Sequence, residues 1–259
     1  MAAISSTISP AGPVTAPSAA PEPATLARPT ALAIVRAFGV MVGGPLLLVA
    51  AAAAAGLHSL RAALAHRPPR PGALGVVAAA AAYAGLVRPW MRRWGASDAD
   101  LARALPGDDV CPDPGLEQTH AIAIDAPAED VWPWVAQLGQ DRGGFYSYTF
   151  LENLAGCRMR NADRIHPEWQ DRRVGDTVLL HPSSGLEILR LDAGRAIVFE
   201  GGWALAIEPD GPGRCRLLAR FRFPRGALSI GYALLLELPH FVMERKMLLE
   251  IKRRAEAAR

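Results

Sequence analysis

Cysteine is scarce in this 259-residue chain, which contains three widely spaced copies. Cys111, Cys157 and Cys215 form no C-x-x-C pair, and an odd number without a pattern does not make a disulfide framework. We therefore expect reduced thiols that fill space in a cytosolic domain. The cysteines predict neither a redox centre nor a metal site.

Long basic stretches are missing too. The formal net charge is +3, aromatic residues make up 7% of the chain, and no run of lysine and arginine is interleaved with aromatics. Nucleic acid is therefore not an expected partner. The sequence also lacks a nucleophile elbow, a phosphate-binding loop and a dinucleotide fingerprint, because the Gly143-Gly144 pair has none of the flanking residues such sites need. No cofactor is predicted.

Hydrophobic residues are abundant, at 51%, and they are concentrated before residue 90. The segment 37–57 (AFGVMVGGPLLLVAAAAAAGL) holds 21 residues without a charge. A helix of that length rises about 30 Å, which is the thickness of the hydrocarbon core of a bilayer. Gly43, Gly44 and Pro45 would bend this helix without breaking it in lipid. We predict that the segment spans a membrane.

A second apolar block, 72–87, is shorter and rich in alanine. Arginines and the tryptophans Trp90 and Trp94 follow it at once, as in the belts found at membrane interfaces. We predict a membrane anchor over residues 31–94, with helices at about 35–57 and 72–90. A helix lying in the interface is the alternative for the second block. Residues 1–30, rich in proline and alanine, are predicted to form a disordered tail because they offer nothing periodic to bury.

Arginines on the two sides of the anchor predict its orientation. If both blocks span, they form a hairpin flanked by five arginines, whereas its loop holds three: Arg28, Arg36, Arg88, Arg92 and Arg93 against Arg61, Arg67 and Arg70. Positive residues favour the inner side, so the soluble domain is expected on the cytoplasmic side of an inner or plasma membrane. A cleaved signal peptide is the competing interpretation, although the long neutral region before the first block argues against it.

Residues 95–115 read as an acidic, turn-rich linker in which Ser97 and Asp100 have the spacing of a capping box. A folded domain is predicted over 116–259, and we expect residues 96–259 to fold alone, on the premise that the anchor contributes nothing to the sheet. Alternating or strand-like runs predict strands at 119–125, 177–181, 186–192, 196–200, 203–208 and 214–223, the later ones in an antiparallel meander.

Helical spacing predicts a helix that starts at Pro127 and ends at Gly139, a second over 146–154 and a long one over 239–257. The fold class is therefore α+β, with the last helix packed on one face of the sheet. Arg220 and Arg222 alternate with phenylalanines on the last strand, and we expect these arginines on a solvent-exposed face.

Several of these segments resemble the SRPBCC superfamily, which includes START, Bet v 1 and polyketide cyclase/dehydrase-like proteins. The stretch IAIDAPAEDVWPWVAQLGQ (Ile122–Gln140) is similar to the first strand and helix of that family. GFYSYTFLENLAG (Gly144–Gly156), NADRIHPEWQDRRVGD (Asn161–Asp176) and HFVMERKMLLEIKRRAE (His240–Glu256) resemble an uncharacterised bacterial branch of it. The resemblance implies a helix-grip fold, in which a curved antiparallel sheet grips the C-terminal helix around a hydrophobic small-molecule pocket.

The densest group of polar and aromatic residues lies between 144 and 169. Such side chains orient a ligand in an otherwise apolar pocket, and in a helix-grip fold this region would border the mouth of the cavity. The predicted ligand-binding residues are Tyr146, Tyr148, Asn153, His166 and Trp169, together with Trp203 on a strand that faces the core or the cavity. The alternative is a loop held together by its own hydrogen bonds and aromatic contacts.

Neither a metal nor a catalytic residue is predicted in this region. The spacing of Asp163, His166 and Glu168 matches no common zinc signature. Tyr146 or His166 could exchange a proton with a carbonyl compound, but no paired base is visible at a fixed spacing. The first expectation is a membrane-anchored module that binds a lipid or another hydrophobic small molecule. The alternatives are a cyclase- or dehydratase-type enzyme using the same cavity, and a protein-interaction or regulatory domain without a ligand.

Overall fold

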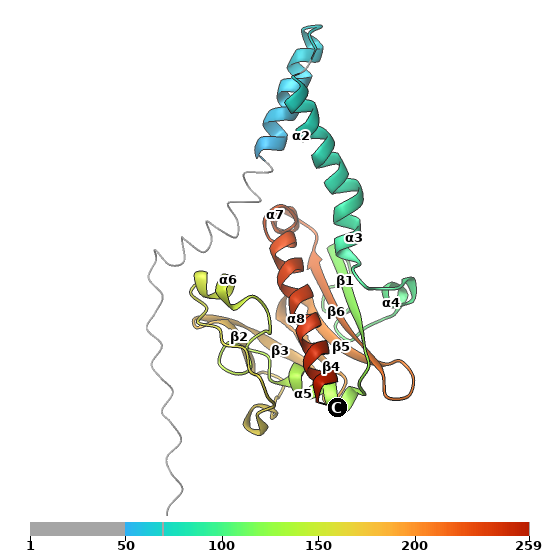
Figure 1. Ribbon diagram of the computed structural model, residues 1–259, viewed down its shortest axis with the longest axis vertical. Helices are drawn as coiled ribbons and strands as arrows, with labels where there is room; N and C mark the ends of the chain where they lie inside the picture. The colour runs from blue at the N-terminus through green and yellow to red at the C-terminus, as the bar shows by residue number, and fades with distance from the viewer. Residues whose placement is uncertain (1–49, 69, 259) are drawn as a thin grey trace, which may run out of the picture.

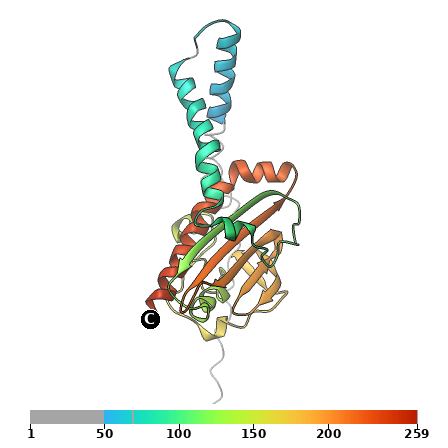
Figure 2. The ribbon, with the colours of Figure 1, turned by 90° about the vertical axis from the view of Figure 1, so that its right-hand side faces the viewer.

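The computed structural model describes residues 50–68 and 70–258. The predicted tail, 1–30, lies outside these residues, as does most of the first predicted span. Its described part, 50–57, belongs to a helix over 50–64. A second helix runs back beside it in both views, as α2 (Pro71–Ala82), a π-helical turn η1 (Tyr83–Val87) and α3 (Arg88–Arg92) (Figures 1 and 2).

One helix in the described part of the chain, the 22-residue Pro71–Arg92, is long and apolar enough to cross a membrane. It coincides with the second predicted block, which had looked the weaker candidate because it is rich in alanine. Its apolar side chains, such as Leu74, Val77 and Leu86, are exposed. Figure 1 shows that this helix stands clear of the domain until α3 reaches it.

Six antiparallel strands form one curved sheet in the order β1-β6-β5-β4-β3-β2. The strands are β1 (Pro114–Ile124), β2 (Thr177–His181), β3 (Ser184–Asp192), β4 (Ala196–Phe199), β5 (Trp203–Pro209) and β6 (Cys215–Pro224). The predicted meander is confirmed, since each strand from β2 to β5 pairs with the next strand along the chain. The first strand then pairs with the last, which leaves β1 and β2 at the two edges.

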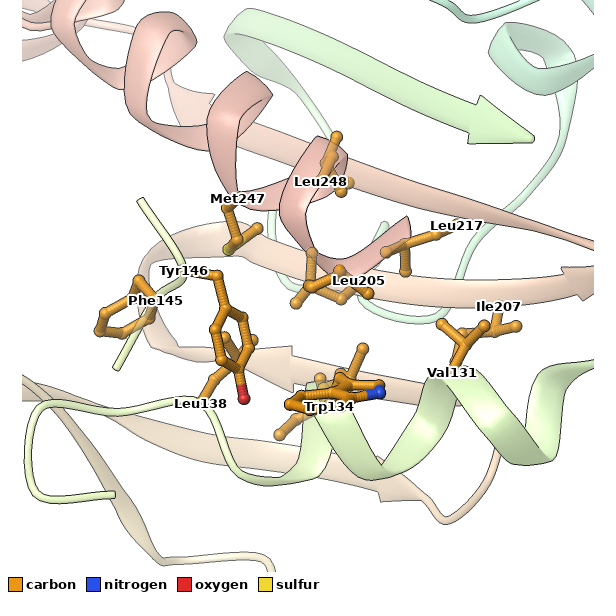
Figure 3. Packing of buried hydrophobic residues seen from close by; sticks show 14 of the residues in the cluster. Val131, Trp134, Leu138, Phe145, Tyr146, Leu205, Ile207, Leu217, Met247 and Leu248 are labelled. Carbon is orange, nitrogen blue, oxygen red and sulfur yellow. The ribbon is translucent and has the colours of Figure 1, made fainter. Parts of the chain in front are cut away.

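The inner face of the sheet is covered by α8 (Glu237–Ala257) and α5 (Ala128–Ala136), in the arrangement expected for a helix-grip fold (Figure 1). Side chains at alternate positions of β5 and β6, such as Leu205 and Leu217, meet Leu248 of α8 and Val131 of α5 in one buried cluster (Figure 3). Alternation along each strand explains why one set of residues reaches this core.

The outer face of the sheet carries ion pairs. The sequence predicts that this face is exposed to solvent, but another part of the chain covers it. Residues 96–113, including the short α4 (Asp98–Ala102), lie across it, and Figure 2 shows α4 in front of β1 and β6. Arg220 is only 3% exposed and pairs with Asp108 at 2.8 Å, while Arg222 donates to the backbone carbonyl of Asp108. The arginines lie on the outer face as predicted, but the expectation that they are solvated is wrong, because the acidic segment covers them and supplies their partners.

The capping box of α4 is confirmed, since the backbone N–H of Asp100 donates to Ser97 and the Asp100 carboxylate accepts from the Ser97 backbone. Two further short elements lie near the cavity described below: α6 (Thr149–Leu154) and the 3-10 turn η3 (Glu200–Gly202). Another 3-10 turn, η2 (Pro167–Trp169), lies in the long loop before β2. The helix α7 (Ala227–Leu235), between β6 and α8, was not predicted from the sequence.

The last turn of the apolar helix Pro71–Arg92 belongs to the domain. Met91 is 2% exposed, its carbonyl lies 2.9 Å from Nε2 of His120 on β1, and the N–H of Ala121 donates to the carbonyl of Trp94. The premise that the anchor contributes nothing to the sheet is therefore wrong. Arg88 adds a 2.8 Å ion pair with Glu237 at the start of α8.

Candidate functional site

A cavity of about 500 Å³ lies between the sheet and the N-terminal half of α8. Its volume falls in the range of about 300–1,000 Å³ that small-molecule sites occupy. Most of its wall is apolar. The lining residues are Phe145, Ser147, Glu152, Met159, Leu180, Leu186, Glu200, Gly201, Trp203, Phe221, Phe223, Tyr232, His240, Met243, Glu244 and Met247.

Strand register places the cavity at one end of the sheet. Phe221 of β6 lies opposite Trp203 of β5, which lies opposite Phe199 of β4. The Trp203 and Phe199 rings stack with their centroids 4.7 Å apart. The cavity extends from this aromatic row toward Phe223, where β6 leads into α7. At the other end of the strands, the core residues are packed against α5 and the second half of α8.

A buried carboxylate, Glu244 of α8, lies in the wall of this cavity at 3% exposure. The indole N–H of Trp203 donates to its Oε1 at 2.7 Å, and Nδ1 of His120 makes a short contact with its Oε2. His240, one turn earlier on α8, places Nε2 3.4 Å from Oε1. A buried charge is tolerated only when it is paired and hydrogen-bonded, and three partners meet this need here.

The electrostatics of Glu244 follow from these partners. Burial alone would raise the pKa of the carboxyl group, but the nearby His240 and His120 outweigh burial and lower the pKa below its usual range. The carbonyl of Met91 can only accept, so His120 carries a proton on Nε2. His120 therefore links the last turn of the apolar helix Pro71–Arg92 to the carboxylate at the cavity.

Tyr232 of α7 extends the polar network across the cavity wall. Its hydroxyl makes a short hydrogen bond with Nδ1 of His240, which also lies 3.2 Å from Nε2 of Gln118. Burial, with the negative charge of Glu244, raises the pKa of Tyr232 above its usual range, so this side chain stays neutral. Both ring nitrogens of His240 are therefore engaged by protein groups.

Glu152 of α6 is another buried carboxyl group at the cavity, and it differs from Glu244 in its hydrogen bonding. The side chain is 7% exposed, it lines the cavity, and its Oε2 has no hydrogen-bond partner among the described residues. Burial raises its pKa from 4.5 to about 7. The carboxyl group therefore exists in both protonation states near neutral pH, and it can donate to or accept from a polar group placed in the cavity.

Trp203 is the one residue of the predicted ligand-binding set that lines the cavity. Tyr146 is fully buried in the core, where its ring lies beside Trp134 (Figure 3) and its hydroxyl accepts a 2.8 Å hydrogen bond from Gln137. Burial raises its pKa above the usual range despite the opposing effects of Gln137 and Arg254. Its neighbours Phe145 and Ser147 face the cavity instead.

The four remaining residues of that set are not brought together at the cavity wall. The side-chain amide of Asn153 donates to the backbone carbonyl of Met159 and accepts from its backbone N–H. These two hydrogen bonds hold the loop after α6. Tyr148 precedes α6 and packs edge-on against Phe150. His166 stacks on Trp169 at a centroid distance of 4.0 Å within the long loop. Their roles in ligand binding stay predictions, and their contacts here hold loops together.

Sequence reasoning missed His120, Gln118, Tyr232, His240, Glu244 and Glu152. Glu244 belongs to the charged run Glu244-Arg245-Lys246, a pattern that by itself indicates a solvent-exposed face of the last helix. One signal could have identified it: it is spaced i+3 from Phe241 and i−3 from Met247, both on the apolar face. A charge within an apolar stripe requires buried partners, and histidines on a neighbouring strand are natural ones.

No group of three or more histidine, cysteine, aspartate or glutamate side chains is placed to hold a metal ion within residues 50–68 and 70–258. The thiol of Cys157 lies near Glu152, and burial with that neighbour raises its pKa to about 11. It is therefore a neutral thiol rather than a nucleophile or ligand at neutral pH.

Comparison with known proteins gives structural likenesses only. No protein-family model matches the chain, and no curated protein matches it. The polyketide cyclase-like protein Cgl2372 from Corynebacterium glutamicum is 18% identical, with 57% of this chain and 94% of that chain covered at a TM-score of 0.30. CalU16 from Micromonospora echinospora is also 18% identical, with 54% and 84% covered at a TM-score of 0.25. Likeness of this degree carries no argument, so the site is assigned from its geometry.

Proposed function

We propose that the protein is a membrane-anchored module that binds a lipid or another hydrophobic small molecule in the cavity between α8 and the sheet. The observation that carries this proposal is a 500 Å³ space with a mainly apolar wall, left open in a domain whose other half is closely packed. Protein interiors normally fill such space. A regulatory domain without a ligand would be expected to collapse around it.

The lining residues suggest how a ligand would be held. Three methionines, Met159, Met243 and Met247, line the cavity, and their flexible thioethers adapt to ligands of varied shape. Trp203 would supply a flat wall, while Glu152 would meet one hydroxyl or carbonyl group of the ligand. We assign Tyr146, Tyr148, Asn153, His166 and Trp169 supporting roles, in which they position the loops that present the lining residues.

An enzyme of cyclase or dehydratase type is the second candidate, and one observation favours it. The Oε2 atom of Glu152 has no hydrogen-bond partner among the described residues, and the carboxyl group has a pKa of about 7, a value suited to a general acid or base. It could remove a proton from the carbon beside a carbonyl group and return it. Deuterium exchange into acetoacetyl-N-acetylcysteamine would test this, and exchange by the native chain that persists in Glu152→Gln would exclude the assignment.

Membrane attachment is proposed from the exposed apolar helix Pro71–Arg92, which only lipid would cover adequately along its length. Together with the preceding helix it would form the predicted hairpin, and the arginine balance favours a cytoplasmic domain. Fractionation should find the chain in the membrane pellet after a carbonate wash. A reporter after residue 259 that is active only outside the cytoplasm would reverse the orientation.

The binding proposal is tested with the full chain in detergent and the fluorescent fatty acid cis-parinaric acid. Met243 lines the cavity, while the adjacent Val242 is 37% exposed. Met243→Trp should fill the space and weaken binding at least tenfold, whereas Val242→Trp should leave binding unchanged. Native mass spectrometry of the purified chain should in addition show a retained ligand. Equal binding by both variants would refute the cavity as the binding site.

A further inference from the structure

The helix α7 presents an apolar surface that nothing in the described chain covers. Leu228 is 78% exposed, Ile230 63% and Leu234 47%, whereas Ser229 and Tyr232 point into the domain. These three apolar side chains lie two to six residues apart on a helix of nine residues. Exposed apolar residues clustered on one short helix mark an interaction surface rather than chance exposure.

The position of α7 identifies its partner. The start of α8, which directly follows α7, meets α3 through Glu237, which pairs with Arg88 at 2.8 Å and with Arg92 at 3.5 Å. Both ribbon views place α7 at the end of the domain that faces α2 and α3, and in Figure 2 it runs crosswise to that long helix. A helix crosswise to a membrane span lies parallel to the membrane surface.

Apolar exposure continues from the span to α7. Leu86 is 73% exposed and Trp90 54%, and both lie on the turns just before and within α3, which contacts the start of α8 next to α7. A tryptophan and arginines at the foot of a span are typical of the interfacial zone of a bilayer. One lipid surface would cover the span and the outer face of α7 together, which favours lipid over a protein partner.

The cavity opens at the same end of the domain. Tyr232 of α7 and Phe223 at the end of β6 line it, and its most exposed lining residues are Leu180, Glu200 and Gly201. The turn η3 that holds the last two lies beside the end of β6, since Gly202 approaches the Arg222 carbonyl closely. The cavity wall beside α7 is therefore the wall nearest α3, at the C-terminal end of the helix Pro71–Arg92.

We propose that α7 lies in the membrane surface and that the cavity takes up its hydrophobic ligand directly from the bilayer. The second part of this inference rests on the proposed binding function, whereas the first part does not. The ligand class would be an amphiphile dissolved in the membrane, with an apolar body and one polar group. Tyr232 would then connect the membrane contact to the polar network, through His240 and Glu244.

The membrane contact is tested by depth-dependent quenching. The full chain with Leu228→Cys, labelled with bimane, is placed in nanodiscs of phosphatidylcholine with brominated acyl chains. The control is Asp210→Cys, in the exposed turn between β5 and β6 at the opposite end of the sheet. The unsubstituted chain corrects for labelling of native cysteines. Bromine should quench bimane at 228 at least threefold more than at 210, and equal quenching would overturn the proposal. Protection of position 228 from water without quenching by bromine would indicate a second copy of the chain and overturn it as well.

Uptake from the bilayer is tested with the double variant Leu228→Asp, Ile230→Asp, whose exposed positions leave the core untouched. cis-Parinaric acid is presented either in phosphatidylcholine vesicles or in detergent solution. The variant should take up the probe from vesicles at least fivefold more slowly, with unchanged equilibrium binding in detergent. Unchanged uptake from vesicles would overturn this inference. If the native chain binds no probe in either form while quenching at 228 persists, the proposed function fails and the membrane contact of α7 stands.

Discussion

The two halves of α8 lie on the same sheet yet have opposite surroundings. In the C-terminal half, Leu248, Ile251 and Ala255 are completely buried in the core cluster that includes residues of the sheet and α5, and Figure 3 shows Leu248 there. In the N-terminal half, Met243 and Glu244 border a cavity. A single amphipathic helix thus closes one end of the domain and leaves the other open. The fold alone therefore does not decide whether the space between helix and sheet is filled.

The difference between the two halves follows from the residues that face them. α5 inserts Val131 and Trp134 under the second half of α8, whereas α7 reaches the first half with Tyr232, which lines the cavity without filling it. The first half instead presents Glu244 and His240, whose groups are held by hydrogen bonds to β1, β5 and α7. A satisfied polar network is rigid and resists collapse, because collapse would break its bonds in a dry interior. The following variants separate these two causes.

Removing the centre of the polar network should have the largest effect. Glu244→Ala leaves His120 and the indole N–H of Trp203 buried without their acceptor. Loss of one partner from a buried charged pair costs about 3–5 kcal/mol. We expect a fall in the free energy of unfolding of that size, measured by urea titration of the full chain in detergent. A loss below about 1 kcal/mol would show that the network does not hold the cavity open.

The two halves of α8 should respond differently to the same kind of truncation. Leu248→Ala opens a hole in the packed half and should lower the free energy of unfolding by about 2–5 kcal/mol. Met243→Ala only enlarges an existing space, so we expect a loss below about 1 kcal/mol with altered binding of cis-parinaric acid. Equal losses in the two variants would mean that the cavity is closed in solution.

Tyr146 offers a test of the packed core beside the cavity. Tyr146→Phe leaves the amide N–H of Gln137 without one acceptor in a buried setting. We expect a loss of about 1–3 kcal/mol in stability, because an unsatisfied buried donor carries this penalty. Binding of cis-parinaric acid should change little. Weak binding with unchanged stability would instead support a direct role in the ligand site, as the sequence had suggested.

Glu152 makes the open half sensitive to pH, with the smallest effect. Its carboxyl group stays protonated up to about pH 7 in the folded chain but ionises above about 4.5 when unfolded. Stability should therefore fall as pH rises from about 4.5 to 7 and change no further above that range. The contribution is about 1–2 kcal/mol after allowance for partial solvation. Glu152→Gln should flatten this part of the pH profile of melting temperature, and an unchanged profile would contradict the assignment.

Much of the fold could be predicted from the local pattern. The strands at 177–181, 203–208 and 214–223, the helix after Pro127 and the Ser97–Asp100 capping box all depend on neighbours within a few residues, and each was placed within a few residues of its observed bounds. The helix α7 was missed because its residues, ALSIGYALL, are apolar almost throughout and show no amphipathic period. A helix that is apolar on almost every side carries little of the usual periodic signal.

Residues of the site were harder to find because they come from distant parts of the chain. The segment 144–169 was correctly singled out as bordering the cavity, but Phe145, Ser147, Glu152 and Met159 line it rather than the five polar and aromatic residues predicted there. Tyr146 has a positive φ of 53°, a backbone conformation that residues other than glycine seldom adopt. The spacing of residue types along the sequence does not predict such a backbone conformation.

The sequence by itself determined the apolar helix before residue 94, the order of the strands along the chain and the long final helix, because these depend on composition and on periods of two or 3.6 residues. Only the tertiary structure decided that Glu244 meets His120 across 124 positions of sequence, that Arg220 is covered by Asp108, and that a cavity remains beside α7. These are contacts between chain-distant residues. Their energies depend on burial and on the position of the partner, and neither is written in the local order of residues.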